Sequence, residues 1–309
     1  MNPFAHVGLA NPILTEQPLA LQTTWRIGGA ARWLLRPASL DELGRLLTCW
    51  PAGIPRLVLG GGSNVLVADQ GFAGAVLDLT HGVNRIYTVT ESLKEDGSVL
   101  IHADAGAATR ALAHFARRAG LRGAEFLAGI PGSIGGAVRM NAGAYGGEMR
   151  EILKEVELLN ARGERLVRTP EQLGMGYRCC TGLGDQIVIS VRVCLQPDDP
   201  EQIRQRMRTF NRQRRLSQPL EWPNAGSVFK NPPAGGKAWE LIAQAGLRGM
   251  QRGDAQISPK HCNFFVNLGQ ATAAQMHDLI TMTQQQVAQH SGVLLQPEVQ
   301  LVGWNREAP

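Results

Sequence analysis

The sequence predicts an α+β protein with about two domains. The chain has 309 residues, which is enough for two domains that each bury a core of their own. Short apolar runs typical of strands and longer runs with helical spacing both occur along the chain, without a regular β-α-β-α alternation. No internal repeat or low-complexity segment is visible. We therefore expect mixed strands and helices in both domains rather than a doubly wound sheet.

The first half of the chain is expected to contain an irregular arm, two helices and a series of short strands. Residues 1–22 form the arm, and Thr24–Ala30 indicates a short strand that runs into a glycine turn. Ser39 and Glu42 make a capping box, and leucines at helical spacing follow until Pro51 closes this helix. Further strands are predicted at 57–59, 65–67, 75–79, 86–89 and 99–103, and a second helix at 108–119.

The second half contains a predicted domain boundary. After a glycine-rich stretch, strands are predicted at 156–159, 165–167 and 186–193. The run Gln196–Pro200 is rich in turn-forming residues and indicates a linker, so we place the domains at 1–198 and 199–309. The second domain should hold an arginine-rich helix, a helix at 238–245, a strand at 263–266, a capped helix from Thr272 to Gly292 and a strand at 298–302.

Composition and cysteine usage indicate a cytoplasmic protein. Hydrophobic residues make up 44% of the chain and charged residues 18%, as in ordinary globular proteins. No window is apolar enough for a membrane span, and the first residues lack the basic and apolar pattern of a secretion signal. The five cysteines are odd in number and include the adjacent pair Cys179 and Cys180, with no C-x-x-C. We expect reduced thiols and no metal site.

The net charge of +5 comes from one segment. Residues 201–215 contain six arginines and a single acid, and the rest of the chain is balanced. This distribution argues against a nucleic-acid protein with a broad basic face, but it suits one anionic ligand. Most of these arginines are expected to be a solvated helix face, whereas Arg214 and Arg215, at the helix end, are candidates for binding phosphate.

The stretch Gly129–Gly147 is unusually rich in glycine, with seven in nineteen residues. It matches neither the P-loop nor the dinucleotide fingerprint G-x-G-x-x-G. One interpretation is a loop whose backbone N–H groups approach an anionic ligand, and the other is a set of tight turns. Glycine turns also occur at Arg26–Gly29 and Gly60–Asn64. Together the three could surround a long anionic ligand.

Three polar side chains elsewhere are candidates for chemistry. Ser227 follows Gly226 without a hydrolase elbow or an evident base, which suits proton donation better than nucleophilic attack. Glu298 begins an apolar strand and is either a placed carboxylate or a solvated edge residue. Arg178 stands in a stretch of low charge, where arginine binds carboxylate or phosphate, or it is an ordinary surface residue.

These pieces together resemble the UDP-N-acetylenolpyruvoylglucosamine reductase family. The similar motifs extend over about residues 22–303 in the family's order, and as a set they are highly specific. They lie at 24–29, 60–66, 129–136, 141–146, 177–178, 218–219, 224–232, 255–258 with 260–261, and 297–299.

The resemblance implies an FAD-binding region of the PCMH or vanillyl-alcohol-oxidase type over residues 1–198. This region would consist of two α+β subdomains with a break near 80–95, followed by an α+β substrate-binding domain at 199–309. No histidine lies in the Gly60–Asn64 loop, so FAD is expected to bind non-covalently. The implied cofactor residues are Arg26, Gly60, Gly61, Gly62, Ser63, Asn64, Gly129, Ile130, Pro131, Gly132, Ser133, Gly135, Gly136 and Ala137.

The resemblance also implies an NADPH-dependent reduction of the enolpyruvyl ether of UDP-N-acetylglucosamine to UDP-N-acetylmuramate, a step of peptidoglycan precursor synthesis. Ser227 would donate the proton, and Arg178 and Glu298 would stabilise the developing enolate. Substrate binding is implied for Arg215, Lys230, Asn231 and, more weakly, Gln256. The expected partners are this substrate and NADPH, with no nucleic acid and no membrane, and the expected state is a monomer.

Two departures and two alternatives accompany this resemblance. Many relatives have serine where this chain has Cys180, and a thiol is a poorer hydrogen-bond partner. Only 48 residues separate Arg178 from Ser227, as in the shorter subgroup without a tyrosine-bearing loop over the substrate. The runner-up enzyme is a flavin oxidase or dehydrogenase of the same fold that acts on a small alcohol or hydroxy acid. The other alternative is a non-catalytic nucleotide or nucleic-acid binder that uses the arginines of 201–215.

Overall fold

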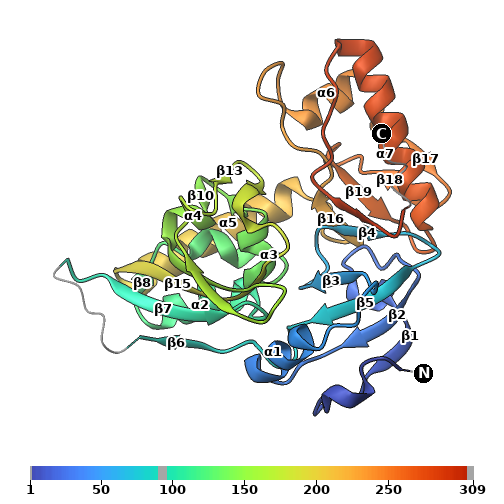
Figure 1. The fold of residues 1–309 in the computed structure, drawn as a ribbon. Helices are drawn as coiled ribbons and strands as arrows, with labels where there is room; N and C mark the ends of the chain where they lie inside the picture. Colours follow the sequence, from blue (N-terminus) through green and yellow to red (C-terminus); the bar gives the residue numbers. More distant parts are fainter. Residues whose placement is uncertain (1, 90–95, 305–309) are drawn as a thin grey trace. The chain divides into compact units, whose positions relative to one another are not determined.

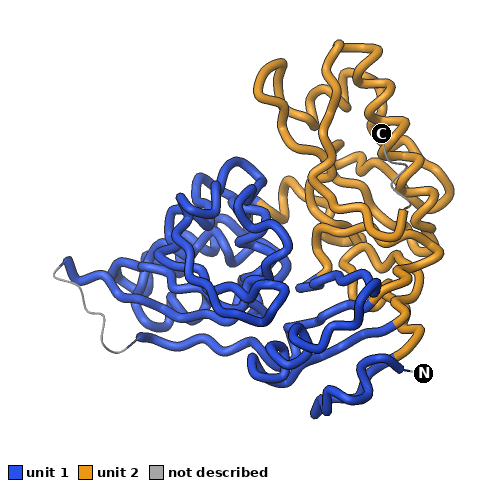
Figure 2. The backbone as a smooth tube through the Cα atoms, in the orientation of Figure 1, with its two compact units in different colours: residues 1–14, 33–61, 75–213 blue, residues 15–32, 62–74, 214–309 orange. Residues whose placement is uncertain are grey.

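The computed structural model describes residues 2–89 and 96–304. These residues form two compact units that interleave along the chain (Figure 2). The first unit combines residues 1–14, 33–61 and 75–213, and the second combines 15–32, 62–74 and 214–309. The predicted domains at 1–198 and 199–309 are defined by the ligand that each part binds. This division stays a prediction. Of the predicted break near 80–95, residues 90–95 lie outside the described residues.

Helices and strands follow one another irregularly, as the α+β class requires (Figure 1). Parallel pairing joins β3 (Arg56–Leu59) to β5 (Phe72–Asp78) and β20 (Gln300–Val302) to β4 (Val65–Val67). The larger sheets of the two units are antiparallel. The predicted α+β class is confirmed. Among the described residues, none of the helices combines the length and the apolar character needed to cross a bilayer.

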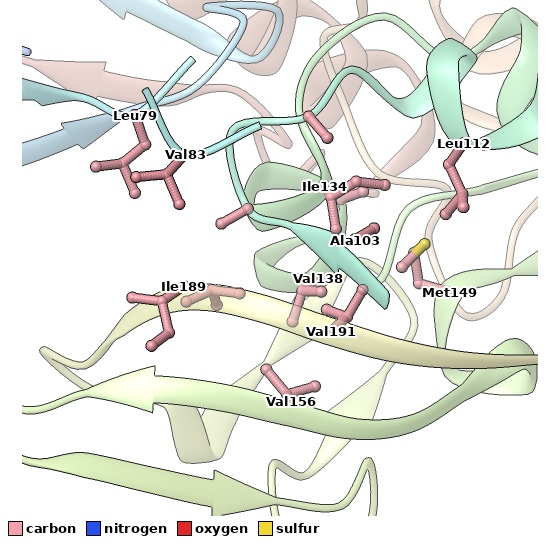
Figure 3. Packing of buried hydrophobic residues seen from close by; sticks show 14 of the residues in the cluster. Leu79, Val83, Ala103, Leu112, Ile134, Val138, Met149, Val156, Ile189 and Val191 are labelled. Atoms are coloured by element: carbon pink, nitrogen blue, oxygen red, sulfur yellow. The ribbon is translucent and has the colours of Figure 1, made fainter. Parts of the chain in front are cut away.

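The first unit is built on an antiparallel sheet covered by short helices. Its strand order is β12-β11-β15-β7-β6, with β8 beside β15. Ile134 and Val138 of α3 point toward Ala103 and Val191 of the sheet, and all four side chains are buried (Figure 3). The strands are β6 (Ile86–Thr88), β7 (Val99–Asp104), β8 (Leu121–Arg122), β11 (Leu153–Leu159), β12 (Arg165–Arg168) and β15 (Ile187–Pro197).

Helices and two short hairpins connect the strands of this sheet. The helices here are α2 (Thr109–Arg118), η3 (Glu125–Gly129), α3 (Ile134–Arg139), α4 (Met149–Ile152), η4 (Thr181–Leu183) and α5 (Pro200–Ser217). Two hairpins accompany them, formed by β9 (Gly143–Ala144) with β10 (Gly147–Glu148) and by β13 (Met175–Gly176) with β14 (Cys179–Cys180).

A four-stranded sheet has the order β1-β2-β5-β3. Its strands are β1 (Leu14–Pro18), β2 (Ala30–Leu35), β5 (Phe72–Asp78) and β3 (Arg56–Leu59). Helix α1 (Leu40–Thr48) follows β2, and only half of its predicted capping box forms: Ser39 Oγ accepts the Glu42 amide at 3.2 Å, but the Glu42 carboxylate does not accept the Ser39 amide. The buried Glu42 carboxylate accepts the amides of Ala10 at 3.1 Å and Ala38 at 2.9 Å, which fixes the start of the helix.

The second unit combines a sheet of order β16-β19-β18-β17 with two helices. Its core includes Trp25, Phe229, Phe265 and Leu279, all buried. Thr272 caps α7 and Gly292 ends it in a left-handed conformation, both as predicted. The elements are β4 (Val65–Val67), β16 (Asn224–Ser227), α6 (Ala238–Gln244), β17 (Gln251–Arg252), β18 (Ala255–Ile257), β19 (Phe264–Asn267), α7 (Ala273–Ser291) and β20 (Gln300–Val302).

Two expectations for the N-terminal segment are wrong. Residues 1–22 are not an irregular arm, because they contain η1 (Ala5–Val7), β1 and η2 (Leu19–Gln22). Nor is there a strand at the start of Thr24–Ala30, since β2 begins only at Ala30. The side chains of Trp25 and Ile27 are buried in the core of the second unit. Their apolar pattern therefore reflects this burial and not the alternation of a strand.

The predicted linker Gln196–Pro200 is also wrong. Gln196 and Pro197 continue β15 and pair with Arg122 and Leu121 of β8. Pro200 is the first residue of α5, and Asp199 Oδ1 accepts the Glu201 amide at 3.0 Å. Asp before a helix and Pro at its first position are start signals, and the same residues are common in linkers.

Candidate active site

Two of the predicted cofactor loops meet in the first unit. A Cβ at Gly61 would lie 2.7 Å from the Cα of Gly132, and a Cβ at Gly60 would overlap the Ser133 hydroxyl. The turn after β3 and the loop before α3 therefore touch through their backbones, which only glycine permits. Thr109 fastens this loop, because its hydroxyl donates to the Ile130 carbonyl oxygen at 2.5 Å.

Several amides of the glycine loop are already used inside the protein. The amides of Ile134 and Gly135 donate to the carbonyl oxygens of Ala107 and Ala105, at 2.9 and 2.8 Å. The Gly136 amide donates to the Ser133 hydroxyl at 3.4 Å. Among the described residues, no backbone acceptor is found for the amides of Gly132 and Ser133.

This contact of the two loops, here called the backbone cradle, is explained first by packing. At Gly60 and Gly61 the space that a Cβ would take is filled by Ser133 and Gly132 of the other loop, so both positions require glycine whether or not a ligand binds. Gly132 adopts φ +117°, a conformation that a larger residue would strain. The amides of Gly132 and Ser133 would suit an anionic group such as a diphosphate, and the binding of FAD by this loop stays a prediction.

The third predicted cofactor loop, Arg26–Gly29, lies in the second unit, where hydrogen bonds of the preceding residue, Trp25, connect it to β19. The indole N–H of Trp25 donates to the Phe265 carbonyl oxygen at 2.8 Å, and the Asn267 side chain donates to the Trp25 carbonyl oxygen at 3.0 Å. The Thr24 amide donates to the carbonyl oxygen of Gly62 at 3.0 Å. Arg26 is exposed and has φ +57°. Arg26 therefore lies on a turn whose neighbours are fixed beside Gly62.

Asn64 connects its glycine turn to the predicted catalytic acid. Its side-chain N–H donates to the backbone carbonyl oxygen of Glu298 at 3.0 Å. The Gln300 amide donates to the Asn64 carbonyl oxygen at 2.9 Å, and β4 and β20 continue side by side from there. The backbone at Glu298 is consequently fixed by the end of the Gly60–Asn64 turn.

A backbone hydrogen bond connects Glu298 to the residue that follows Ser227. The Glu298 amide donates to the carbonyl oxygen of Val228, the residue after Ser227, at 2.7 Å. A register shift in β16 and φ +75° at Gly226 precede Ser227, as in a β-bulge. Both Ser227 and Glu298 are half-buried. The two predicted catalytic residues are therefore neighbours within the second unit.

The predicted substrate residues belong to the same unit but differ in their surroundings. The Lys230 amide donates to the Gln296 carbonyl oxygen at 2.9 Å, one step from the Ser227–Glu298 pairing. Asn231 Oδ1 accepts the amide of Ala238 at 3.0 Å, which fixes the start of α6.

Gln256 and Arg215 complete this set. The Gln256 side chain donates locally to the Gly249 carbonyl oxygen at 3.3 Å, which gives it a structural task. Arg215 is exposed at the end of α5, and its carbonyl oxygen accepts a hydrogen bond from the Lys260 ammonium at 2.7 Å. Lys260 belongs to the family motif at 260–261, but nothing in the sequence indicates its contact with this helix end.

Arg178 lies in the first unit, in the turn between β13 and β14. Its φ is +51°, and its guanidinium lies over the Tyr177 ring at 5.3 Å. Nη2 donates to the Gly143 carbonyl oxygen at 2.7 Å, and Nη1 to that of Asn141 at 3.4 Å. The second half of the glycine-rich stretch therefore holds Arg178. Asn141 is a residue for which sequence reasoning gave no role, although its place in a glycine-rich run marks it as a residue that tolerates φ > 0.

Two titratable groups near these segments have shifted pKa values. Burial raises the pKa of the Cys180 thiol, and its Sγ donates to the Leu173 carbonyl oxygen at 3.5 Å. Burial lowers the pKa of His261, whose Nδ1 accepts the Asn263 amide at 3.3 Å. Both groups are therefore neutral and structural near pH 7. All five cysteines are free thiols, as expected.

Part of the arginine-rich helix is explained by ion pairs. Arg204 pairs with Glu201 at 2.6 Å on the surface of α5. Arg206 bridges Glu125 and Asp198 at 2.9 and 2.6 Å, and thereby ties α5 to the rest of the first unit. The local excess of positive charge is thus partly structural.

Comparisons with known proteins agree along nearly the whole chain. Residues 31–168 match the family model described as FAD binding domain, and residues 218–302 match UDP-N-acetylenolpyruvoylglucosamine reductase, C-terminal domain. The UDP-N-acetylenolpyruvoylglucosamine reductase of Magnetococcus marinus is 50% identical over 93% of this chain and 91% of its own length. That of Carboxydothermus hydrogenoformans is 41% identical over 96% of this chain and 95% of its own length.

A comparison with solved structures indicates the same family. The crystal structure of UDP-N-acetylenolpyruvylglucosamine reductase (MurB) from Thermus caldophilus superposes with a TM-score of 0.77 at 37% identity, covering 94% of this chain and 98% of that one. This match and the FAD-binding model confirm the predicted fold, and they decide between the enzyme and the non-catalytic alternative. The chain is an FAD-dependent oxidoreductase and belongs to the UDP-N-acetylenolpyruvoylglucosamine reductase family.

Proposed function

We propose that this enzyme uses NADPH to reduce the enolpyruvyl ether of UDP-N-acetylglucosamine to UDP-N-acetylmuramate, in peptidoglycan precursor synthesis. The chemistry that FAD supplies when bound is hydride transfer, from NADPH to the terminal vinyl carbon of the ether. The observation that carries the proposal is the backbone hydrogen bond between Glu298 and Val228, which holds the acid beside Ser227.

Ser227 donates the proton that completes the reduction. A hydride at the terminal carbon leaves negative charge on the enolate, and a proton at the adjacent carbon then gives the saturated lactyl ether. The hydride and the proton together account for the two hydrogens added to the double bond. A hydroxyl can make this donation, and the bulge at Gly226 sets its position in β16.

Glu298 and Arg178 stabilise the developing charge. The guanidinium of Arg178 is always charged, and its planar fork matches a carboxylate. Two of its N–H groups are oriented by the carbonyl oxygens of Gly143 and Asn141. A protonated Glu298 can donate a hydrogen bond to the enolate oxygen, and Asn64 fixes the backbone from which this side chain projects.

The diphosphate and uridine are bound by Lys230, Asn231 and Arg215, with a smaller contribution from Gln256. Lys230 lies close to the Ser227–Glu298 pairing along the backbone, which suits a contact near the sugar end of the substrate. Arg215 is exposed, and Lys260 supports the end of the helix on which it lies. FAD is held non-covalently by the turns at Arg26 and Gly60–Asn64 and by the loop Gly129–Ala137.

Anaerobic stopped-flow spectroscopy of the flavin tests this function. NADPH should bleach the flavin absorbance, and the enolpyruvyl ether should then restore it. UDP-N-acetylglucosamine is the matched control, because it has the same nucleotide and sugar without the double bond and should restore nothing. Reduction of the flavin by a small hydroxy acid, together with no reduction by NADPH, would contradict the proposal.

A further inference from the structure

We propose that Asn141 is a positioning residue that holds Arg178 through the loop to which the guanidinium is bound. The inference rests on the proposed role of Arg178 in stabilising the enolate. Arg178 lies in the turn between β13 and β14, and Asn141 lies just after α3, at the start of the loop that leads into β9. The two residues are thus on separate segments, and hydrogen bonds join these segments in both directions.

The side chain of Asn141 is fully buried and uses both of its N–H donors and one of the two acceptor positions of its oxygen. Its Nδ2 donates to the Gly176 carbonyl oxygen at 3.0 Å and to Glu148 Oε2 at 3.1 Å. Its Oδ1 accepts the amide of Arg150 at 3.0 Å. One amide group therefore connects its own loop to the hairpin of Arg178 and to the start of α4.

Arg178 makes the hydrogen bonds in the opposite direction, from the β13–β14 hairpin to the loop of Asn141. Its guanidinium donates to the Gly143 carbonyl oxygen at 2.7 Å and to the Asn141 carbonyl oxygen at 3.4 Å. The Asn141 side chain meets the hairpin at Gly176, and the Arg178 side chain meets the loop at Asn141 and Gly143. The result is a closed ring of hydrogen bonds that fixes the plane of the guanidinium, not only the charge.

The ring has little freedom to adjust. Gly143 pairs with Glu148, and a Cβ at Gly143 would lie 2.7 Å from the Glu148 Cβ, so this carbonyl is held in a tight hairpin. Asn141 and Arg178 both have left-handed backbones, with φ of +38° and +51°. Such conformations are maintained only where surrounding bonds determine them. Loss of the bond between Asn141 and Gly176 should therefore change the position of the guanidinium.

Asn141→Asp is the most informative substitution. Aspartate has the same shape, tolerates φ > 0, and keeps an acceptor for the Arg150 amide. It loses the N–H donor to the Gly176 carbonyl oxygen. The new carboxylate oxygen would face that carbonyl oxygen and the Glu148 carboxylate, and both would repel it. Asn160→Asp is the matched control, because Asn160 also joins a hairpin turn, accepting the amides of Arg162 and Glu164 at 2.9 and 3.0 Å and donating to Glu164 Oε2 at 2.6 Å.

The experiment measures both half-reactions of the flavin in the holoenzyme and combines the substitution with Arg178→Ala. Asn141→Asp should leave reduction by NADPH within about 2-fold of the wild type and should slow reoxidation by the enolpyruvyl ether by about 10- to 100-fold, as expected of a misplaced catalytic group. Asn160→Asp should leave both rates unchanged. In the Arg178→Ala background, Asn141→Asp should have no further effect on reoxidation, because the residue it positions is gone.

The outcomes separate this inference from the proposed function. If Arg178→Ala is reoxidised at the wild-type rate, the proposed role of Arg178 fails. If Arg178→Ala is slow but Asn141→Asp behaves as Asn160→Asp, or if the two losses multiply in the double variant, Asn141 does not act through Arg178. Should Asn141→Asp not fold, Asn141→Gly keeps the left-handed backbone without the side chain and enters the same cycle.

Discussion

The side chain of Asn64 donates a hydrogen bond to the backbone carbonyl oxygen of Glu298, 3.0 Å away and 234 positions along the chain. Asn64 ends a glycine turn proposed to bind FAD, and Glu298 is the proposed acid. One contact thus fixes the acid relative to part of the cofactor site. The parallel pairing of β4 with β20 continues from it, so the arrangement belongs to the core of the second unit.

Glu298→Gln should slow reoxidation of the flavin by the enolpyruvyl ether by about 10²-fold or more, while reduction by NADPH stays unchanged. Glutamine keeps the backbone bonds to Asn64 and Val228 and can still donate a hydrogen bond, but its amide N–H is a far weaker acid than a carboxylic acid and stabilises the developing enolate less. Stopped-flow absorbance measures both steps. Glu155→Gln is the control, since Glu155 belongs to the sheet of the first unit and pairs with Arg192 at 3.1 Å. Wild-type reoxidation in Glu298→Gln would make Glu298 an ordinary strand-edge residue.

Gly61→Ala should weaken FAD binding by at least about 10-fold, which corresponds to about 1.4 kcal/mol. The new Cβ would lie 2.7 Å from the Gly132 Cα, so the two loops of the cradle must separate. Titration of the apoprotein with FAD measures this loss. Gly44→Ala is the control, because Gly44 lies in α1 with no atom within 4 Å of the added Cβ. Equal FAD affinity in the two variants would rule out the cradle.

Protonation of His261 should destabilise the fold below neutral pH. Burial lowers the folded pKa of His261 from about 6.5, so the unfolded chain binds a proton that the folded chain excludes. The free energy of unfolding should therefore decrease as the pH falls from about 6.5 to the lowered folded pKa, and then level off. Urea unfolding at a series of pH values, compared between His261→Gln and the exposed His114→Gln, measures this contribution. An unchanged pH slope in His261→Gln would contradict it.

Elements with local signals were predictable from the sequence. Helix α7 has a capping box at Thr272, a glycine stop at Gly292 and an apolar stripe between them, and the structure reproduces all three. Local signals also misled, since Asp199 and Pro200 begin a helix where a linker was predicted. Asp and Pro are common both in linkers and at helix starts. The pairing of β15 with β8, which the local sequence does not show, distinguishes the two cases here.

The candidate site was predictable as a set of residues but not as a geometry. Ser227, Glu298 and Arg178 stand in recognisable motifs, whereas their connections are made by backbone groups, which have no sequence signal. Nothing in the sequence indicates that the Glu298 amide meets the Val228 carbonyl oxygen, or that segments 15–32 and 62–74 join the C-terminal unit. These contacts depend on packing between segments far apart in the chain.

The reoxidation rate of Ser227→Ala tests the central claim most directly. The variant should be reduced by NADPH at the wild-type rate, and its reduced flavin should react with the enolpyruvyl ether about 10²- to 10⁴-fold more slowly, because the proton donor is missing. Ser291→Ala is the control, since the Ser291 hydroxyl makes local bonds at the end of α7, donating to the Val287 carbonyl oxygen at 2.8 Å and accepting the Val293 amide at 3.4 Å. Equal losses in the two half-reactions, or a wild-type rate of reoxidation, would show that Ser227 is not the proton donor.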